Sequence, residues 1–261
     1  MMRFTVLASG SKGNATVVEA EGRRILIDCG LSYRELTKRL DIVGLKPTDL
    51  DALLITHLHS DHIRGVSSVL DKVPLKVFAR QEFYGIPLGI KSYKLRAYEE
   101  FELDALKITA LPLPHDDGGS FGFVVNSNST RLVFATDLGF PTDELALALK
   151  SADATVIESN HCLKMLDECS YPHFIKERIR SEYGHLSNCQ SADLLSRFLF
   201  KQCQHVVLAH LSEKANHPAQ AMATMHHAIN KKVSVASQTV PTEWFNIFKS
   251  SSELALAPSL A

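Results

Sequence analysis

Four residues that commonly bind metal ions stand within one short segment, THLHSDH: His57, His59, Asp61 and His62. Imidazole and carboxylate groups are ligands for Zn²⁺, Mn²⁺ and Fe²⁺. The apolar run before them, residues 51–56, predicts a buried strand. In an extended chain His57 and His59 point to one side, and Asp61 and His62 can face the other side as the chain turns into a helix. This spacing suits two metal ions better than one.

Three further residues of ligand type each follow a hydrophobic run: His115, Asp137 and His210. Strand ends that share one edge of a sheet are where α/β proteins place their sites. Each residue alone has an ordinary structural explanation, since Asp137 could cap a helix and either histidine could be hydrogen-bonded at the sheet edge. Together with the first four they complete a set of seven candidate ligands, in which Asp137 would bridge two ions.

The elements that must position these residues can be predicted from hydrophobic patterns. Short β-branched runs predict strands at residues 4–8, 23–28, 51–56, 75–79, 106–112, 120–125, 130–136, 154–159, 205–210 and 232–236. Helical periodicity predicts helices at residues 32–43, 64–70, 143–150, 172–184, 188–201 and 218–230. The mixture indicates sheets covered by helices on their outer faces. We predict one α/β domain over residues 1–240 and a C-terminal extension over residues 241–261, with a frayed tail.

The composition limits the class of protein. A chain of 261 residues with 45% hydrophobic content is globular. Its five cysteines are odd in number and widely spread, which favours free thiols in a reducing compartment. No apolar run reaches the length of about 18 residues that a membrane span needs. The formal charge of −1 argues against avid, non-specific binding of nucleic acid. We expect a soluble, cytoplasmic protein without a membrane partner.

On these residues the chain resembles the metallo-β-lactamase fold hydrolases, which are αββα sandwiches of two mixed sheets flanked by helices. The resemblance spans about residues 4–236. It implies two ligand sets that share Asp137: His57, His59 and His115 for the first ion, and Asp61, His62 and His210 for the second. It also implies that Asp28 orients groups of the metal site, although Asp28 could instead cap the following helix.

Two divalent ions would lower the pKa of a bridging water towards neutrality, giving hydroxide, and would polarise a carbonyl or phosphoryl oxygen. Such a site is that of a hydrolase, but it does not select the ester. The identity of the metal stays open, because Zn, Mn and Fe all suit His/Asp sites.

Two segments resemble the phosphodiesterases of this superfamily: residues 156–166, VIESNHCLKML, and residues 171–188, YPHFIKERIRSEYGHLSN. Glu158 and His185 stand where tRNase Z-type enzymes carry a Glu and a His thought to protonate the leaving group. A carboxylate beside an imidazole fixes its tautomer and stabilises the protonated ring, and general-acid help is worth about 10²- to 10⁴-fold in rate. Alternatively, His185 is an ordinary histidine at a helix end.

The motifs SGSKGNATVVE, ILIDCGLS, THLHSDHIRGV and AHLS together resemble the YycJ/WalJ-type subgroup of bacterial metal-dependent nucleases. The resemblance implies a 5′-exonuclease acting on DNA rather than RNA, and Asp61, Glu158 and His185 are its expected catalytic residues. Cys162 departs from the subgroup, which usually has Asp at this position. His161 is therefore expected behind the ligands rather than among them, and Cys162 is expected to be a small buried residue.

Other activities remain open. A glyoxalase II-like thioesterase or a lactonase would use the same metals without needing His185, because a thiolate leaves unaided. A non-enzymatic partner protein with a residual site is disfavoured by the complete ligand set, since only a metal offsets its desolvation. The mixed face of Lys176, Arg178 and Arg180 is typical of a solvated helix. A nuclease of this kind would grip few phosphates, which favours attack near an end or a protein partner that supplies affinity.

The loop LASGSKGNAT, residues 7–16, allows two interpretations. Its Gly and Asn residues suit an ordinary hairpin turn, and its backbone amides could cradle a phosphate. In the expected fold this hairpin lies at the rim of the metal cleft. Ser9, Ser11 and Asn14 are therefore candidate phosphate contacts as well as turn residues.

Overall fold

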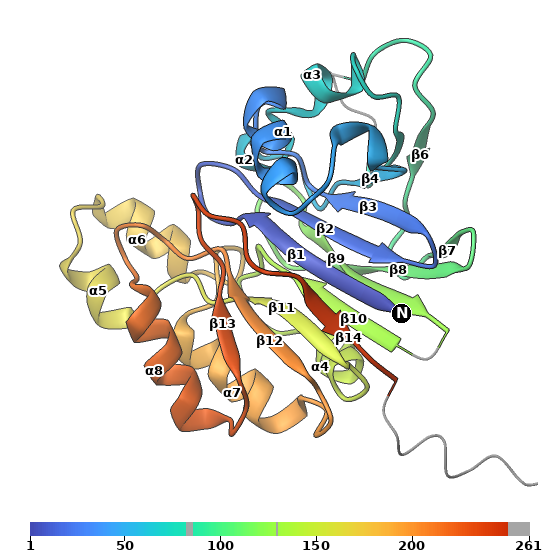
Figure 1. The fold of residues 1–261 in the computed structure, drawn as a ribbon. Helices are drawn as coiled ribbons and strands as arrows, with labels where there is room; N and C mark the ends of the chain where they lie inside the picture. Colours follow the sequence, from blue (N-terminus) through green and yellow to red (C-terminus); the bar gives the residue numbers. More distant parts are fainter. Residues whose placement is uncertain (82–85, 129, 250–261) are drawn as a thin grey trace, which may run out of the picture.

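The computed structural model describes residues 1–81, 86–128 and 130–249, and its strands form two sheets (Figure 1). The first sheet contains β1 (Met2–Ala8), β2 (Ala15–Ala20), β3 (Arg23–Ile27), β4 (Ala52–Leu54), β5 (Lys76–Ala79), β6 (Ser92–Lys94) and β14 (Phe245–Ile247). The second contains β7 (Glu100–Leu103), β8 (Leu106–Leu113), β9 (Ser120–Ser127), β10 (Thr130–Ala135), β11 (Ala154–Glu158), β12 (His205–Ala209) and β13 (Val233–Val235). The helices are α1 (Tyr33–Ile42), α2 (Ser60–Ile63), α3 (Val66–Leu70), α4 (Asp143–Leu149), α5 (Leu163–Glu168), α6 (His173–Arg180), α7 (Asn188–Phe198) and α8 (Pro218–Ala228), with a 3₁₀ turn η1 at Pro47–Asp49.

Strand order confirms the predicted fold class. The first sheet runs β14-β1-β2-β3-β4-β5-β6 and the second runs β13-β12-β11-β10-β9-β8-β7. In Figure 1 the two sheets face each other, with α1 to α3 on one outer side and α4, α7 and α8 on the other. Both sheets are mixed, because β3 to β6 and β10 to β13 are parallel while the remaining neighbours are antiparallel. The protein is an αββα sandwich.

The strand directions bring several carboxyl ends to one edge. β10, β11 and β12 are parallel, and β8 runs with β10 because both are antiparallel to β9. In the other sheet β3 and β4 are parallel. The two sheets are joined at this edge, since the backbone N–H of Phe121 donates to the carbonyl of Thr56 at 2.9 Å. Residues that follow these strands therefore meet at one end of the sandwich.

Three apolar layers hold the sandwich together. The middle layer lies between the sheets and contains Phe4, Leu54 and Phe123 among its fully buried residues. One outer layer packs α1 and α3 against the first sheet, and the other packs α4, α7 and α8 against the second. Amphipathic helices supply these outer layers, as Leu36 and Leu40 on α1 illustrate by being wholly buried at a helical spacing.

Several short elements were not predicted from the sequence pattern. They are β2, β6, β7, β14, α2, α5 and η1. β6 is an exposed three-residue strand, so it has no buried face that could give an alternating pattern. β14 lies beyond residue 240 and pairs with β1 through Met2 and Ile247, so the sheet includes part of the expected C-terminal extension. The expected frayed tail, residues 250–261, lies outside the described residues.

No helix in the described part of the chain is both long enough and apolar enough to cross a membrane.

Phe123→Ala should lower the free energy of unfolding by about 3–5 kcal/mol, because its ring is fully buried between the sheets. Urea unfolding of the metal-free protein measures the change. Phe174→Ala is the matched control, since that ring is 69% exposed and its loss should cost less than about 0.5 kcal/mol. Similar losses in the two variants would contradict the packing described here.

Candidate metal centre

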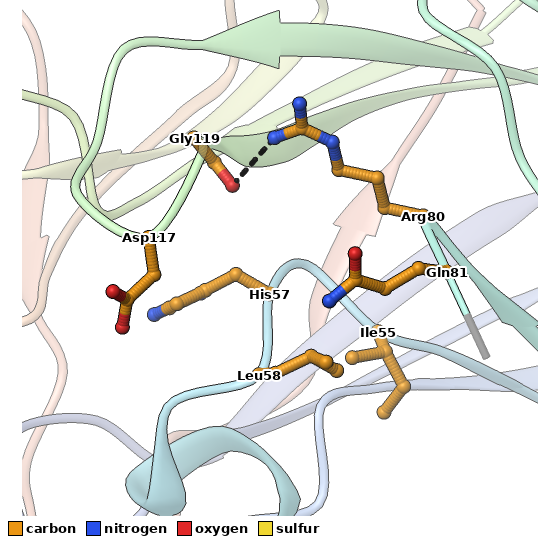
Figure 2. A pocket seen from close by; sticks show the side chains of 7 residues that line it. All are labelled: Ile55, His57, Leu58, Arg80, Gln81, Asp117 and Gly119. Atoms are coloured by element: carbon orange, nitrogen blue, oxygen red, sulfur yellow. Dashed lines mark hydrogen bonds between the residues drawn. The ribbon is translucent and has the colours of Figure 1, made fainter. Parts of the chain in front are cut away.

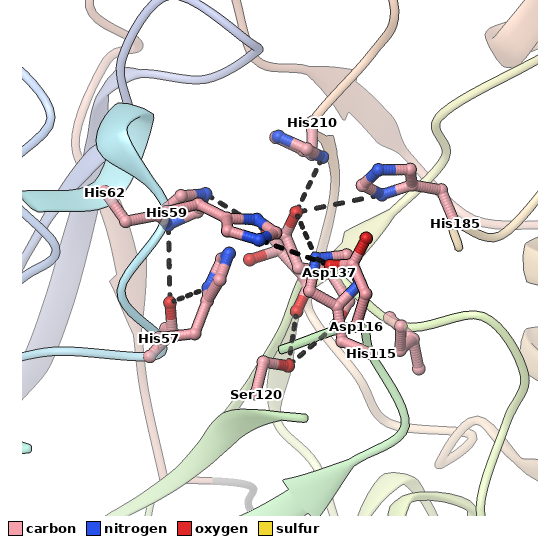
Figure 3. Close-up of polar contacts among 12 residues, drawn as sticks. His57, His59, His62, His115, Asp116, Ser120, Asp137, His185 and His210 are labelled. Atoms are coloured by element: carbon pink, nitrogen blue, oxygen red, sulfur yellow. Dashed lines mark hydrogen bonds and ion pairs between the residues drawn. The ribbon is translucent and has the colours of Figure 1, made fainter. Parts of the chain in front are cut away.

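The structure brings all seven expected ligands together at the edge where the sheets meet. Figure 3 labels six of them, all except Asp61. They lie just beyond β4, in and next to α2, and beyond β8, β10 and β12: His57, His59, Asp61, His62, His115, Asp137 and His210. Five groups of possible ligands in the described residues have atoms that all lie within 4.8 Å of one another. Two of these groups are His57, His59 and His115, and Asp61, His62 and His210. The other three are His57, His62 and Asp137; Asp137, Glu158, His185 and His210; and His59, Asp116 and Asp117. The first two groups coincide with the two sets that the resemblance implies.

Asp137 stands between the two groups. One carboxylate oxygen, Oδ2, is 3.4 Å from His62 Nε2, while the other, Oδ1, is 3.9 Å from His115 Nε2 and 3.3 Å from His210 Nδ1. The residue is 1% exposed. A buried carboxylate in this position can be shared between two cations.

Three histidines are oriented through Nδ1: His57 by the Thr56 hydroxyl at 3.0 Å, His115 by the Gly184 carbonyl at 3.0 Å, and His210 by Glu158 Oε1 at 2.9 Å. Contacts of this type fix the ring and leave Nε2 as the ligand atom. In all three, Nε2 is buried and has no hydrogen-bond partner among the described residues. Oδ2 of Asp137 is in the same condition.

Buried polar atoms without a hydrogen-bond partner destabilise the folded protein unless a bound ion or molecule contacts them. An unpaired buried donor or acceptor costs about 1–3 kcal/mol, and here three nitrogens and one carboxylate oxygen converge on one place. Imidazole nitrogen and carboxylate oxygen are the donors that divalent transition metals accept. The residues present therefore fit the binding of divalent metal.

Asp28 lies behind the ligands and makes no helix cap. Its Oδ2 accepts a 2.7 Å hydrogen bond from His62 Nδ1, and its Oδ1 accepts one from the Thr56 backbone at 2.9 Å. α1 is capped instead by Ser32, whose hydroxyl accepts from the backbone of Glu35. The contacts of Asp28 fix the ring of His62 with Nε2 towards the centre, as expected for a residue that orients a ligand.

The histidines differ in charge because their surroundings differ. Burial lowers the pKa of His57 and of His115, which keeps both rings in the neutral form that binds metal. Burial alone would also lower the pKa of His62, but attraction to Asp137 and Asp28 outweighs it and raises the value to about 10. This part of the site favours a positive charge.

Three residues of the site adopt left-handed backbone conformations next to strand ends: Asp28, Asp137 and His210, with φ of 60°, 60° and 55°. This region costs a residue with a side chain about 1–2 kcal/mol. The conformations turn the chain sharply where β3, β10 and β12 end, so that the side chains point into the centre. The surrounding contacts sustain this strain, which is common at functional sites.

Glu158 contacts His185, as the sequence interpretation requires, and it also contacts His210. Its Oε1 lies 2.9 Å from Nδ1 of each ring. Its other oxygen accepts from the backbone of Leu186 at 2.9 Å. Burial would raise the pKa of this fully buried carboxyl, but the charge and hydrogen bond of His185 and the hydrogen bond of His210 lower it to about 2. Glu158 therefore remains a carboxylate between two imidazoles.

His161 is buried behind the centre and belongs to none of the groups of possible metal ligands in the described residues. Burial lowers its pKa to about 4, so the ring is neutral, and its Nδ1 has no hydrogen-bond partner in the described part of the chain. Cys162 was expected to be buried but is half-buried, because it stands at the exposed start of α5.

The loop of residues 9–14 gives its three candidate residues different surroundings. Ser9 is buried, and its hydroxyl accepts from the backbone of His210 at 2.6 Å. Asn14 is also buried, with Nδ2 at 3.1 Å from Asp61 Oδ2 and 3.0 Å from His62 Nε2. Only Ser11 is exposed. The contacts of Ser9 and Asn14 therefore support the metal centre, and Ser11 is the one side chain of the three that is open to a substrate.

A small pocket of about 240 Å³ lies beside His57 (Figure 2). Its walls are partly apolar, from Ile55 and Leu58, and it contains one guanidinium, that of Arg80. Arg80 donates one hydrogen bond to the carbonyl of Gly119, which also lines the pocket, at 3.0 Å (Figure 2). The pocket places a cation and apolar surface next to the candidate ligands.

Asp116 is a residue of the site that the sequence interpretation missed. Its Oδ1 is 3.2 Å from His115 Nε2 and 3.3 Å from His59 Nε2. The one signal in the sequence was its position directly after His115, within an acidic pair that is equally typical of a turn.

The fold and the site define the class of protein. Two mixed sheets packed as a sandwich, with His and Asp side chains that could hold metal gathered at their shared edge, are the features of a metal-dependent hydrolase of the metallo-β-lactamase fold. The family model "Beta-lactamase superfamily domain" matches residues 23–211. The chain belongs to this superfamily.

Individual relatives narrow the comparison. Over 232 residues the chain is 33% identical to exodeoxyribonuclease WalJ of Streptococcus pneumoniae, with 85% of this chain and 86% of that protein covered. Over 243 residues it is 30% identical to exodeoxyribonuclease YycJ of Bacillus anthracis, covering 88% and 90%. The crystal structure of the metallo-β-lactamase fold protein YhfI from Bacillus subtilis superimposes with a TM-score of 0.70 at 15% identity, covering 92% and 98%, and shares the fold.

Asn14→Ala should weaken metal binding about 10-fold or more, because Asn14 Nδ2 holds the carboxylate of Asp61. Metal content after dialysis against a graded chelator series measures the effect. Ser11→Ala is the matched control in the same loop and should keep the parental metal content, since Ser11 is exposed. Equal retention of metal by the two variants would show that Asn14 does not support metal binding through Asp61.

Proposed function

We propose that this protein is a dinuclear metal-dependent nuclease that hydrolyses phosphodiester bonds of DNA, acting from the 5′ end. One observation supports this activity above others: His185 lies beside Glu158 at the metal centre, with Nδ1 at 2.9 Å from Oε1. The similarity to two exodeoxyribonucleases over most of both chains supports DNA as the substrate.

The proposed ligand sets are those of the two groups, with Asp137 shared. In this assignment His57, His59 and His115 hold one ion, and Asp61, His62 and His210 hold the other. When bound, such ions would lower the pKa of a water molecule and polarise a phosphoryl oxygen. Asp28 and Asn14 orient ligands of the second set through the contacts described above.

His185 supplies the group that distinguishes a phosphodiesterase from a thioesterase. A hydrogen bond from the Nδ1–H of His185 to Glu158 leaves Nε2 available to hold a second proton. The carboxylate then stabilises the resulting imidazolium. The ring is 14% exposed, so it borders the open side of the centre. An alkoxide leaving group needs this proton and a thiolate does not. We propose that His185 protonates the leaving oxygen.

Few side chains near the metal centre are available to bind the phosphates of a nucleic acid. Arg80 in the pocket beside His57 and the exposed Ser11 at the rim are the proposed phosphate contacts. On α6, Arg180 pairs with the carboxylate of Asp167, whereas Lys176 donates to the backbone carbonyl of Asp167 and keeps its charge. A partner protein that supplies further affinity is consistent with these few phosphate contacts.

The five cysteines are all free thiols, which supports the cytoplasm as the compartment.

Metal-loaded protein should shorten 5′-labelled DNA from its labelled end, and Asp61→Ala should abolish this activity. The assay compares single- and double-stranded DNA with RNA of the same sequence, at several concentrations of Mn²⁺ and of Zn²⁺. Asp51→Ala, at a carboxylate that pairs with Arg23 and lies at the opposite end of β4 from His57, should retain full activity. Hydrolysis of thioesters or lactones with every nucleic acid left intact would overturn the proposal.

His185→Ala should reduce kcat on DNA by about 10²- to 10⁴-fold while leaving metal content close to parental, because the ring is proposed to donate a proton rather than bind metal. Bis(p-nitrophenyl) phosphate, a phosphodiester with a p-nitrophenolate leaving group, provides the internal control. Since that group leaves without a proton, its hydrolysis should fall far less than that of DNA. Parallel losses on both substrates, together with lost metal, would make His185 a ligand.

A further inference from the structure

Asp116 has an oxygen atom that the surrounding protein leaves without a partner. The residue directly follows His115 and opens the loop between β8 and β9. Its Oδ1 is buried and accepts no hydrogen bond from any described residue. That oxygen nevertheless lies 3.2 Å from His115 Nε2 and 3.3 Å from His59 Nε2 (Figure 3). It thus faces two nitrogens that are themselves candidate ligands.

These separations are those of atoms bound to one ion. Two ligand atoms that are each about 2.0–2.2 Å from an ion lie about 2.8–3.6 Å from each other for angles between about 90° and 110°. Both measured distances, 3.2 and 3.3 Å, fall in this range. His115 Nδ1 is already used by the Gly184 carbonyl, so Nε2 is the atom that this ring presents to Asp116.

The rest of the Asp116 carboxylate is held from outside the centre. Arg178 on α6 donates to Oδ2 through Nε at 2.6 Å and also contacts it through Nη2. The backbone N–H of Asp116 donates to the carbonyl of Tyr183 at 3.0 Å. Because Oδ2 is engaged by Arg178, Oδ1 is turned towards the histidines, and carboxylate ligands of metals are commonly supported in this way.

The neighbouring aspartate provides a contrast. Asp117 Oδ2 also lies close to His59, at 3.0 Å from Nε2, but its side chain is 83% exposed. Asp116 is 26% exposed and contacts two histidines rather than one. The two acids share a loop, a charge and a contact to His59, with which they form one group of possible metal ligands. They differ in burial, and Asp116 alone of the two also lies next to His115.

We propose that Asp116 is a further ligand of the metal ion assigned above to His57, His59 and His115, and that Arg178 is a positioning residue that aims its carboxylate. The inference rests on the metal centre of the proposed function and adds an oxygen donor to a set otherwise dominated by imidazole. It also assigns a task to α6, whose Arg178 joins the helix to the loop after β8.

Calorimetric titration of the metal-free protein with Mn²⁺ tests the assignment directly. Asp116→Asn should weaken one binding event by about 10- to 100-fold and leave the other unchanged. Asp117→Asn, the matched control, should leave both events within about twofold of the parent. Arg178→Gln should weaken the same event as Asp116→Asn, and combining the two substitutions should add little beyond the loss from Asp116→Asn alone. Unchanged binding in Asp116→Asn overturns the proposal.

Two further measurements guard against a purely structural effect. The thermal unfolding midpoint of metal-free Asp116→Asn should stay close to that of the metal-free parent, because Oδ1 gives up no hydrogen-bond partner and an amide oxygen can still accept from Arg178. The visible absorption of the Co²⁺-loaded protein should change in Asp116→Ala and stay parental in Asp117→Asn, since it reports the atoms around the ion. An unchanged Co²⁺ spectrum in Asp116→Ala also overturns the ligand role. These measurements do not depend on nuclease activity. They can therefore test the role of Asp116 even if the protein does not hydrolyse DNA.

Discussion

The burial of carboxylates at the shared edge of the two sheets is the constraint on which the site depends. Asp28, Asp137 and Glu158 are each at most 1% exposed and lie among histidines. An ionised carboxylate away from water is stable only when positive charge or hydrogen-bond donors surround it. The protein supplies backbone donors to Glu158 and Asp28 but leaves Oδ2 of Asp137 without any among the described residues. The remaining compensation must be cationic, from protonated imidazole or from metal.

That constraint explains how the loops around the centre are built. A network of buried amides joins the segments after β11, α6 and β12, and Asn216 is at its middle. Its Nδ2 donates to the Ser159 carbonyl at 2.8 Å, and its Oδ1 accepts from Asn188 at 3.0 Å. Asn160 donates in turn to the carbonyl of His210 at 2.9 Å. These bonds fix the separations of the backbone segments that carry Glu158, His185 and His210. On the opposite side a side chain on Gly30 would meet the carbonyl of Asp61 at 1.6 Å, so glycine is required there.

Part of this arrangement can be predicted from the sequence, and the rest cannot, for physical reasons. The ligand-bearing strands are buried and regular, so the hydrophobic pattern predicts them, and the HxHxDH spacing indicates the metal chemistry before any contact is known. β6 and β14 each have three residues and depend on the neighbouring strand for their pairing, so no local pattern reveals them. The same holds for contacts between distant segments. Nothing local to Asn14 indicates that it packs against Asp61, and nothing local to Glu158 indicates a second bond to His210.

The distribution of positive charge also bears on how a nucleic acid would be held. α6 carries three cations close together in sequence, and its two arginines are paired with carboxylates: Arg178 with Asp116, and Arg180 with Asp167. In the proposal for Asp116, Arg178 serves the metal centre and cannot also act as a free phosphate contact. Each exposed cation that contacts phosphate adds to affinity and to its dependence on salt. Because both arginines of α6 are paired with carboxylates, a bound nucleic acid would contact few free cations near the centre. Limited contact of this kind suits cleavage at a chain end better than binding along a duplex.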